Sequence, residues 1–163
     1  MSSFWRNWLM VVAVLMALMG LVMGVLSVSA ITAFTGLFDP VFWPDGGPDA
    51  ATVRFQRYVI GGAGGVMAAW GILVYAIARS ALWRPEPWLA SALTASVIVW
   101  FVIDSVAKLA SGAAFFVAGN VPLLVALLLP LVRERAALWG GAQVQSRMTL
   151  PERPERMTSK PSV

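Results

Sequence analysis

Residues 7–38 read NWLMVVAVLMALMGLVMGVLSVSAITAFTGLF and contain no ionisable side chain. A helix of about 20 apolar residues crosses the hydrocarbon core of a bilayer, which is roughly 30 Å thick. Further apolar runs follow at residues 58–78, 88–103 and 109–132. The four runs predict an all-α protein that forms a four-transmembrane-helix bundle. We expect its helices over about residues 8–30, 53–78, 88–110 and 113–133.

The composition agrees with a membrane protein that has no soluble domain. Only 12% of the 163 residues are charged, whereas soluble domains carry about 25%. The four runs leave little chain for anything else, so residues 1–139 are expected to form one transmembrane domain. From Gly140 the chain is polar, rich in proline and alternating in charge. Such a segment buries too little apolar surface to fold, and residues 140–163 are predicted to be a disordered cytoplasmic tail.

The first apolar run has two interpretations. Arg6 provides a basic start and residues 28–30 (VSA) resemble a cleavage site, as in a secretory signal peptide. The apolar stretch is longer than the 7–15 residues of a signal core. A retained membrane anchor is therefore the favoured interpretation.

Residues 35–52 are expected to form an external loop. This segment holds three prolines and three aspartates, and proline removes a backbone donor and fixes φ. We therefore expect no regular helix in it. Phe38, Phe42 and Trp43 are expected to keep the loop at the membrane interface.

The distribution of basic residues predicts the orientation. Four spans place both termini on one side of the membrane. The nine basic residues expected on that side are Arg6, Arg79, Arg84, Arg133, Arg135, Arg147, Arg153, Arg156 and Lys160. The opposite side keeps Arg54, Arg57 and Lys108. Because cytoplasmic segments are enriched in Lys and Arg, we expect a multi-pass protein of a bacterial inner membrane with both termini in the cytoplasm.

The sequence has no Cys and no His. Disulfides, thiolate or imidazole metal sites, haem with a His or Cys ligand and a Ser-His-Asp triad are therefore excluded for this chain alone. We expect no metal, no cofactor and no enzymatic activity. The formal net charge of +4 is attributed to topology and anionic lipid rather than to a nucleic-acid partner.

Two pairs of glycines have the GxxxG spacing that brings transmembrane helices close together. They are Gly20 with Gly24 and Gly61 with Gly65. Small residues four apart let helix backbones approach each other in lipid. Packing within one chain is favoured over a dimer face.

The sharpest candidate site is Asp104 with Lys108, four residues apart on one face of the third long helix. A carboxylate within the apolar span is costly and usually has a partner. Lys108, Arg57 and Arg54 are the candidate counter-ions, and Asn120 is a further polar candidate on the fourth helix. Three roles are left open: an ion pair that fixes helix register, a ligand or proton site, and a charge that reaches the interface.

Four stretches of the chain resemble one known family. They are FDPVFWPDG (38–46), RFQRYVIGGAGGVMAAWGIL (54–73), EPWLASALTASVIVWFVIDSVAKLASGAA (86–114) and NVPLLVALLLPL (120–131). Together they resemble small four-helix bacterial membrane proteins of the BphX-like kind, over a little more than half of the chain. The resemblance implies an architecture but no established activity. Lys108 stands where that family would have a small polar residue, so it transfers no role to Asp104.

These observations lead to two functional hypotheses. The first is an accessory or small-ligand-binding membrane bundle. The alternative is a small permease or proton-coupled carrier that uses Asp104. The lipid bilayer is the expected partner, and a homo-oligomer and a second membrane protein both stay open.

Reporter fusions test the predicted orientation. Fusions after Trp83 and after Val132 are expected to report the cytoplasm, and a fusion near Gly47 is expected to report the outside. A cytoplasmic signal from the Gly47 fusion would reverse the topology.

Overall fold

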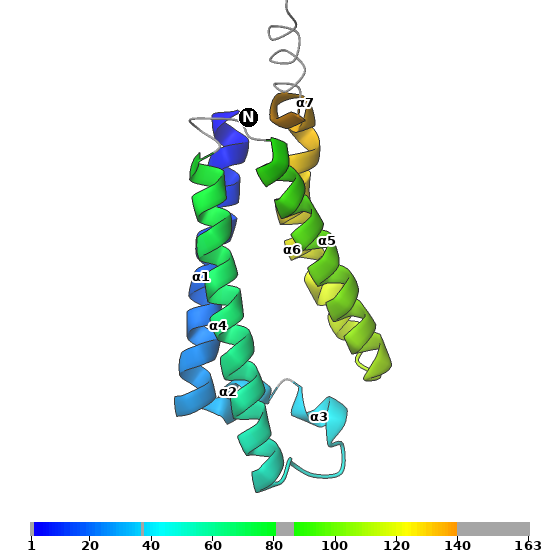
Figure 1. The fold of residues 1–163 in the computed structure, drawn as a ribbon. Coiled ribbons are helices and arrows are strands. Elements are labelled where there is room, and N and C mark those ends of the chain that lie inside the picture. The colour runs from blue at the N-terminus through cyan, green and yellow to red at the C-terminus, as the bar shows by residue number, and fades with distance from the viewer. Residues whose placement is uncertain (1, 37, 81–86, 140–163) are drawn as a thin grey trace, which may run out of the picture.

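The computed structural model describes residues 2–36, 38–80 and 87–139, and the regular structure in these ranges is entirely helical (Figure 1). The predicted tail, residues 140–163, lies outside the described residues. The long helices are α1 (Ser3–Ser29), α4 (Ala50–Ser80), α5 (Pro87–Ala110) and α6 (Phe115–Arg133). The short helices are α2 (Ile31–Thr35), α3 (Asp39–Phe42) and α7 (Arg135–Trp139).

Four helices in the described ranges are long and apolar enough to cross a membrane. This confirms the predicted all-α fold with four candidate spans, as expected of a multi-pass membrane protein. The first helix begins at Ser3, five residues before the predicted start. The fourth long helix contains two prolines, Pro122 and Pro130.

Helices α1 and α4 run antiparallel and touch through their backbones (Figure 1). A Cβ atom on Gly20 would lie 2.4 Å from the backbone N of Ala68. One on Gly64 would lie 2.7 Å from the backbone O of Gly20, and one on Gly71 would lie 2.6 Å from the N of Ala17. Lipid offers little hydrophobic drive for helix association, so close packing of this kind holds transmembrane helices together.

The close contacts of α4 do not follow the predicted GxxxG pair. A Cβ on Gly61 would meet Ser27 Oγ at 2.9 Å, but one on Gly65 would have nothing within 4 Å. Gly24 contributes only its backbone N, which lies 2.8 Å from the Cβ position of Gly64. The small residues at the interface are 61, 64, 68 and 71, spaced by three and four residues. This is the 3.5-residue period of a left-handed helix pair.

Helices α5 and α6 form a second antiparallel pair, and the two pairs meet at the end that carries the N-terminus (Figure 1). The core lies at this end. Its buried members are Leu9, Val12, Ala13, Met16, Val74, Ala78, Ala90, Leu93, Val97, Leu127, Leu131 and Leu138. Toward the opposite end the two pairs diverge, as Figure 1 shows. The fold is therefore anchored at one end of its spans.

A side-chain hydrogen bond joins the two pairs. Pro130 has no N–H, so the carbonyl of Ala126 lacks its usual helical donor. Trp8 Nε1 on α1 donates to this carbonyl at 2.9 Å. The backbone N–H of Ser2 also donates to Glu134 Oε2, at 3.0 Å. Both bonds tie the start of α1 to the C-terminal half of α6 and to Glu134, which follows that helix.

The segment between α1 and α4 contains short helices, so the expectation of no regular helix there was wrong. Helix α3 has Pro40 at its start, where a missing N–H costs nothing because it has no helical partner. The Asp39 carboxylate accepts hydrogen bonds from Thr35 Oγ1 and from Gln56 Nε2, both at 2.8 Å. The Thr35 bond joins α2 to α3, and the Gln56 bond fastens α3 to α4.

Helix α4 begins three residues before its predicted start because Asp49 caps it. Asp49 Oδ1 accepts the backbone N–H of Thr52 at 2.7 Å, which is the hydrogen bond of an N-cap. Hydrogen bonding by Thr52, through its side chain and then its backbone, lowers the pKa of Asp49 from its ordinary value.

The same substitution, glycine to alanine, at two adjacent positions of α4 tests the α1–α4 contact. Gly64→Ala is expected to destabilise the protein by about 1–3 kcal/mol, because the added Cβ meets backbone atoms that cannot move away cheaply. Gly65→Ala should be neutral or stabilising by up to about 1 kcal/mol, through helix propensity. Thermal unfolding in detergent measures both. Equal effects of the two variants would contradict the packing.

A double-mutant cycle tests the bond between the pairs. Trp8→Phe is expected to cost about 0.5–1.5 kcal/mol by removing the donor to the Ala126 carbonyl. In a Pro130→Ala background, the new N–H at position 130 can occupy that carbonyl, so the same change should cost less. Additive effects of the two substitutions on unfolding free energy would show that the Trp8 bond does not compensate for Pro130.

Candidate functional site

The hairpin between α5 and α6 brings the polar candidates together. Gly112 has φ +72°, the left-handed conformation that favours glycine. The N–H of Ala113 donates to the Lys108 carbonyl at 2.9 Å, and that of Gly112 donates to the Leu109 carbonyl at 3.1 Å. These two bonds form a Schellman motif that ends α5. The chain therefore reverses at Ser111 and Gly112, between the helices expected over residues 88–110 and 113–133.

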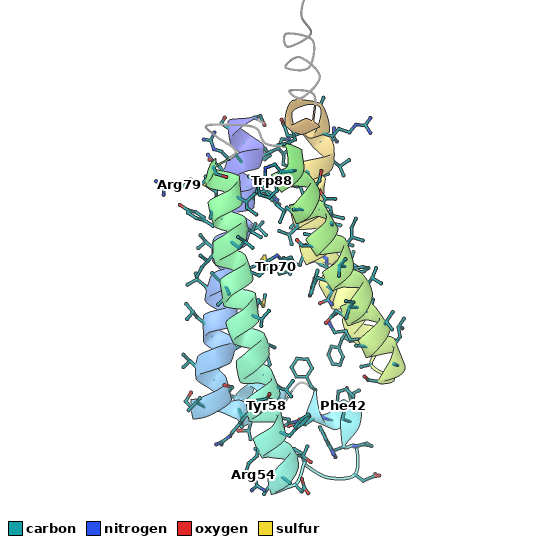
Figure 2. The ribbon with its side chains drawn as sticks, viewed as in Figure 1. Phe42, Arg54, Tyr58, Trp70, Arg79 and Trp88 are labelled. Carbon is teal, nitrogen blue, oxygen red and sulfur yellow. The ribbon has the colours of Figure 1, made fainter. Side chains whose placement is uncertain are left out.

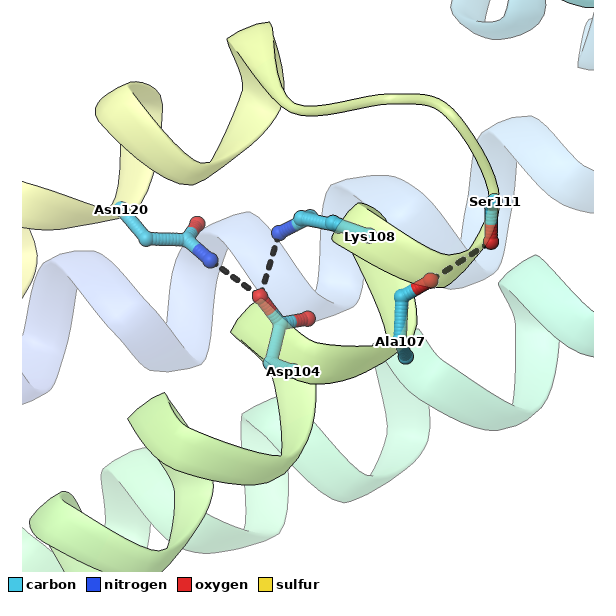
Figure 3. A network of polar contacts seen from close by, with 5 residues as sticks. All are labelled: Asp104, Ala107, Lys108, Ser111 and Asn120. Atoms are coloured by element: carbon cyan, nitrogen blue, oxygen red, sulfur yellow. Dashed lines mark hydrogen bonds and ion pairs between the residues drawn. The ribbon is translucent and has the colours of Figure 1, made fainter.

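One carboxylate oxygen holds the site together. Lys108 Nζ lies 2.5 Å from Asp104 Oδ2, and Asn120 Nδ2 on α6 donates to the same oxygen (Figure 3). The Lys108 side chain is 26% exposed and that of Asp104 is 32% exposed. We call Asp104, Lys108 and Asn120 the polar triad. It is a charge pair within one helix, with one amide from the neighbouring helix.

The polar triad lies within the apolar spans, near the end opposite the termini. Asp104 is six residues before the end of α5 and Asn120 five residues after the start of α6. At 1.5 Å per residue these positions are about 9 Å and about 8 Å from the helix ends. Its neighbours along α5, Ile103 and Val106, are exposed apolar residues. An unpaired charge at such a level would be costly, and the pairing reduces that cost.

Asp104 lies on the same face of α5 as the residues that are buried in the core near the start of that helix. Asp104 follows Val97 by seven residues and Trp100 by four, so the three share one face of the helix. Val97 is fully buried in the core, and the rings of Trp100 and Trp70 on α4 are 5.6 Å apart. Figure 2 shows Trp70 midway along α4, between the two helix pairs. Asp104 lies beyond this aromatic contact, where the pairs diverge.

The two candidate arginines are not part of the triad. Arg54 and Arg57 are exposed in the first turns of α4, and Figure 2 shows Arg54 at the far end of that helix. Within the described ranges, neither arginine forms an ion pair with Asp104. Of the three predicted counter-ions, the structure brings Lys108 to Asp104.

Two polar groups were not predicted from the sequence. Gln56 binds Asp39 through Nε2, while its Oε1 is buried without a hydrogen bond in the described structure. Ser105 follows Asp104 in the sequence. Its Oγ is also buried without a hydrogen bond in the described structure. No spacing pattern distinguishes either residue from an ordinary polar residue of a membrane helix.

The triad offers hydrogen bonds rather than covalent chemistry. The Lys108 ammonium has two further N–H donors, and Asn120 keeps its carbonyl oxygen and one N–H. Asp104 Oδ1 is available as an acceptor. No group of three or more His, Cys, Asp or Glu side chains that could hold a metal occurs among the residues described. These groups suit a small molecule that both donates and accepts hydrogen bonds.

The sequence matches no protein-family model, and neither the curated proteins nor the solved structures include a significant match. The resemblance to BphX-like proteins therefore stays a prediction.

A double-mutant cycle on the triad separates structural from functional roles. Asp104→Asn is expected to cost about 1 kcal/mol, near the upper value for solvent-exposed pairs and well below the ~3–5 kcal/mol of fully buried ones. Adding Lys108→Gln should recover much of the loss, because no charge is then left unpaired. The free energy of unfolding in detergent measures the cycle.

A loss of several kcal/mol from Asp104→Asn would identify the pair as structural. Simple additivity would mean that Lys108 is not the energetic partner of Asp104, and the cycle with Arg57 would follow.

Proposed function

We propose that this chain is a small accessory membrane protein that binds a small polar ligand at Asp104, Lys108 and Asn120 and performs no catalysis. One observation carries the proposal: the Asp104–Lys108 pair lies within one helix and is about one-third exposed. A pair four residues apart on α5 cannot fix that helix against another. Only Asn120 links α5 to α6 through the triad.

The cost of the triad also supports a ligand role. Ionisable residues within membrane spans are rare and commonly mark functional sites. An apolar α5 face would pack as well without two charges, whereas a polar ligand needs donors and acceptors that lipid does not supply. The remaining donors of Lys108 and the free acceptors of Asp104 and Asn120 meet that need.

The proposal includes an inner-membrane location in a bacterium, with both termini cytoplasmic. The excess of basic residues on the terminal side supports it. The polar triad then lies in the outer half of the membrane. The resemblance to BphX-like membrane proteins supports the same architecture.

The divergence of the helix pairs favours a second candidate, a proton-coupled carrier. The pairs are packed together at the terminal end and apart at the other (Figure 1). Carriers alternate between states that open to one side, by rocking one helix group against another. A carboxylate beyond the closed end, as Asp104 is, suits proton coupling.

Mass spectrometry of small molecules that co-purify with the full chain tests ligand binding. We expect a species retained by the wild-type protein and lost from Asp104→Asn and Asn120→Leu. Asp45→Asn removes a carboxylate from the exposed outer segment, so this control should retain the species. Identical sets from all four proteins would contradict ligand binding at the triad.

Proteoliposomes with an internal pH dye distinguish the carrier. A carrier should move protons in the wild type and fail in Asp104→Asn. If the protein binds a ligand without transporting protons, the pH dye should give the same signal with the wild type and with Asp104→Asn.

A further inference from the structure

A contact between two aromatic rings joins the helix pairs at the end opposite the termini, where the helices themselves diverge. The ring of Phe38, which precedes α3, has its centroid 5.0 Å from that of Phe116 on α6. The centroid of the Phe34 ring on α2 is 5.7 Å from that of Phe38. Both Phe38 and Phe116 are half-buried. The segment between α1 and α4 therefore reaches across to the second helix pair, in line with the place of α3 in Figure 1.

Helix register places this contact one turn beyond the polar triad. Phe116 precedes Asn120 by four residues, so both side chains lie on one face of α6, about 6 Å apart along the helix. On the other side of the triad, Trp100 precedes Asp104 by four residues on α5. The ring of Trp100 is 5.6 Å from that of Trp70 on α4. Along the helices, the triad thus lies between two ring contacts, and each of them joins the two helix pairs.

Hydrogen bonds on both sides of Phe38 fix its position. Its backbone N–H donates to the Thr35 carbonyl at 2.7 Å. The next residue, Asp39, accepts hydrogen bonds from Thr35 Oγ1 and from Gln56 Nε2 on α4. The backbone at Phe38 is therefore fastened to the first helix pair. A single ring pair is a weak interaction compared with the buried core at the terminal end, so the contact with Phe116 can open while the core stays closed.

We infer that Phe38 and Phe116 form a gate, which must open before a polar molecule reaches the triad from the water at this end. A polar molecule that came through the lipid would lose its hydrogen bonds to water, and the buried core closes the terminal end. The remaining route passes Phe116, one turn beyond Asn120. The gate takes its physiological meaning from the proposed ligand role of the triad, but its opening can be measured without a ligand.

Thiol labelling of the full chain in lipid nanodiscs tests the gate, because the sequence has no cysteine. Asn120→Cys places one thiol at the triad, and a negatively charged methanethiosulfonate measures its access from water. Both faces of a nanodisc are open to the reagent, so the result does not depend on the orientation in the membrane. Adding Phe38→Ala is expected to raise the labelling rate about 3- to 10-fold, the change in population that follows from loss of a typical ring pair.

Phe42→Ala is the matched control. It removes an exposed ring of α3, 5.8 Å from that of Trp43, and should leave the labelling rate unchanged. Phe116→Ala removes the other ring of the gate and replaces Phe38→Ala if that variant does not fold. The two gate substitutions together should raise the rate hardly more than either alone, because the two rings form one contact.

Three results would overturn the gate: equal labelling rates with and without Phe38→Ala, an equal increase from Phe42→Ala, or increases from Phe38→Ala and Phe116→Ala that multiply in the double variant. Labelling needs no bound molecule, so its outcome is distinct from that of the ligand test. A protein in which the gate opens as expected but from which no ligand co-purifies would refute the proposed function alone.

Discussion

The backbone contact between α1 and α4 is the constraint on which the rest of the structure depends. Gly20, Gly64 and Gly71 bring peptide groups of the two helices together where any larger residue would push them apart. In lipid such proximity replaces the hydrophobic drive that a soluble bundle would use. The pair then provides a rigid surface on which α5 and α6 dock at one end only. The contacts of Leu9 and Val74 with the common core, and the Trp8 bond, complete that docking.

The number and type of the helices were predictable because hydropathy along the chain reflects the solvent of each segment. The run from residue 7 onward needs no packing partner to identify it as a span. The contacts were less predictable. A GxxxG search found Gly20 but selected Gly65 in place of Gly64, because the α1–α4 seam follows a period of 3.5 residues. The bond from Trp8 to Ala126 joins residues far apart in the sequence. Pro130 leaves that carbonyl open in any helix that contains it, but only the fold shows that Trp8 reaches it.

The candidate site was predictable where its residues share one helix. Asp104 and Lys108 are four residues apart, so helical geometry alone places them together. Asn120 was a separate candidate, and its hydrogen bond to Asp104 depends on the exact length of the turn at Gly112. Arg54 and Arg57 were offered as counter-ions because they lie at a similar depth along their helix. Residues at the same level along two helices can still be far apart sideways. The divergence of the helix pairs separates α4 from this part of α5.

Pro122 has a mechanical consequence for the site. Because this proline lacks an N–H, the carbonyl of Ala118 loses its helical donor, and α6 bends more easily there than elsewhere. From Leu127 onward the helix is fixed in the core by buried Pro130 and Leu131. The segment from Phe115 to Val121, at the end of α6 away from the core, carries Asn120. Bending at Pro122 would change the distance between Asn120 and Asp104 while leaving the anchored half of α6 in place.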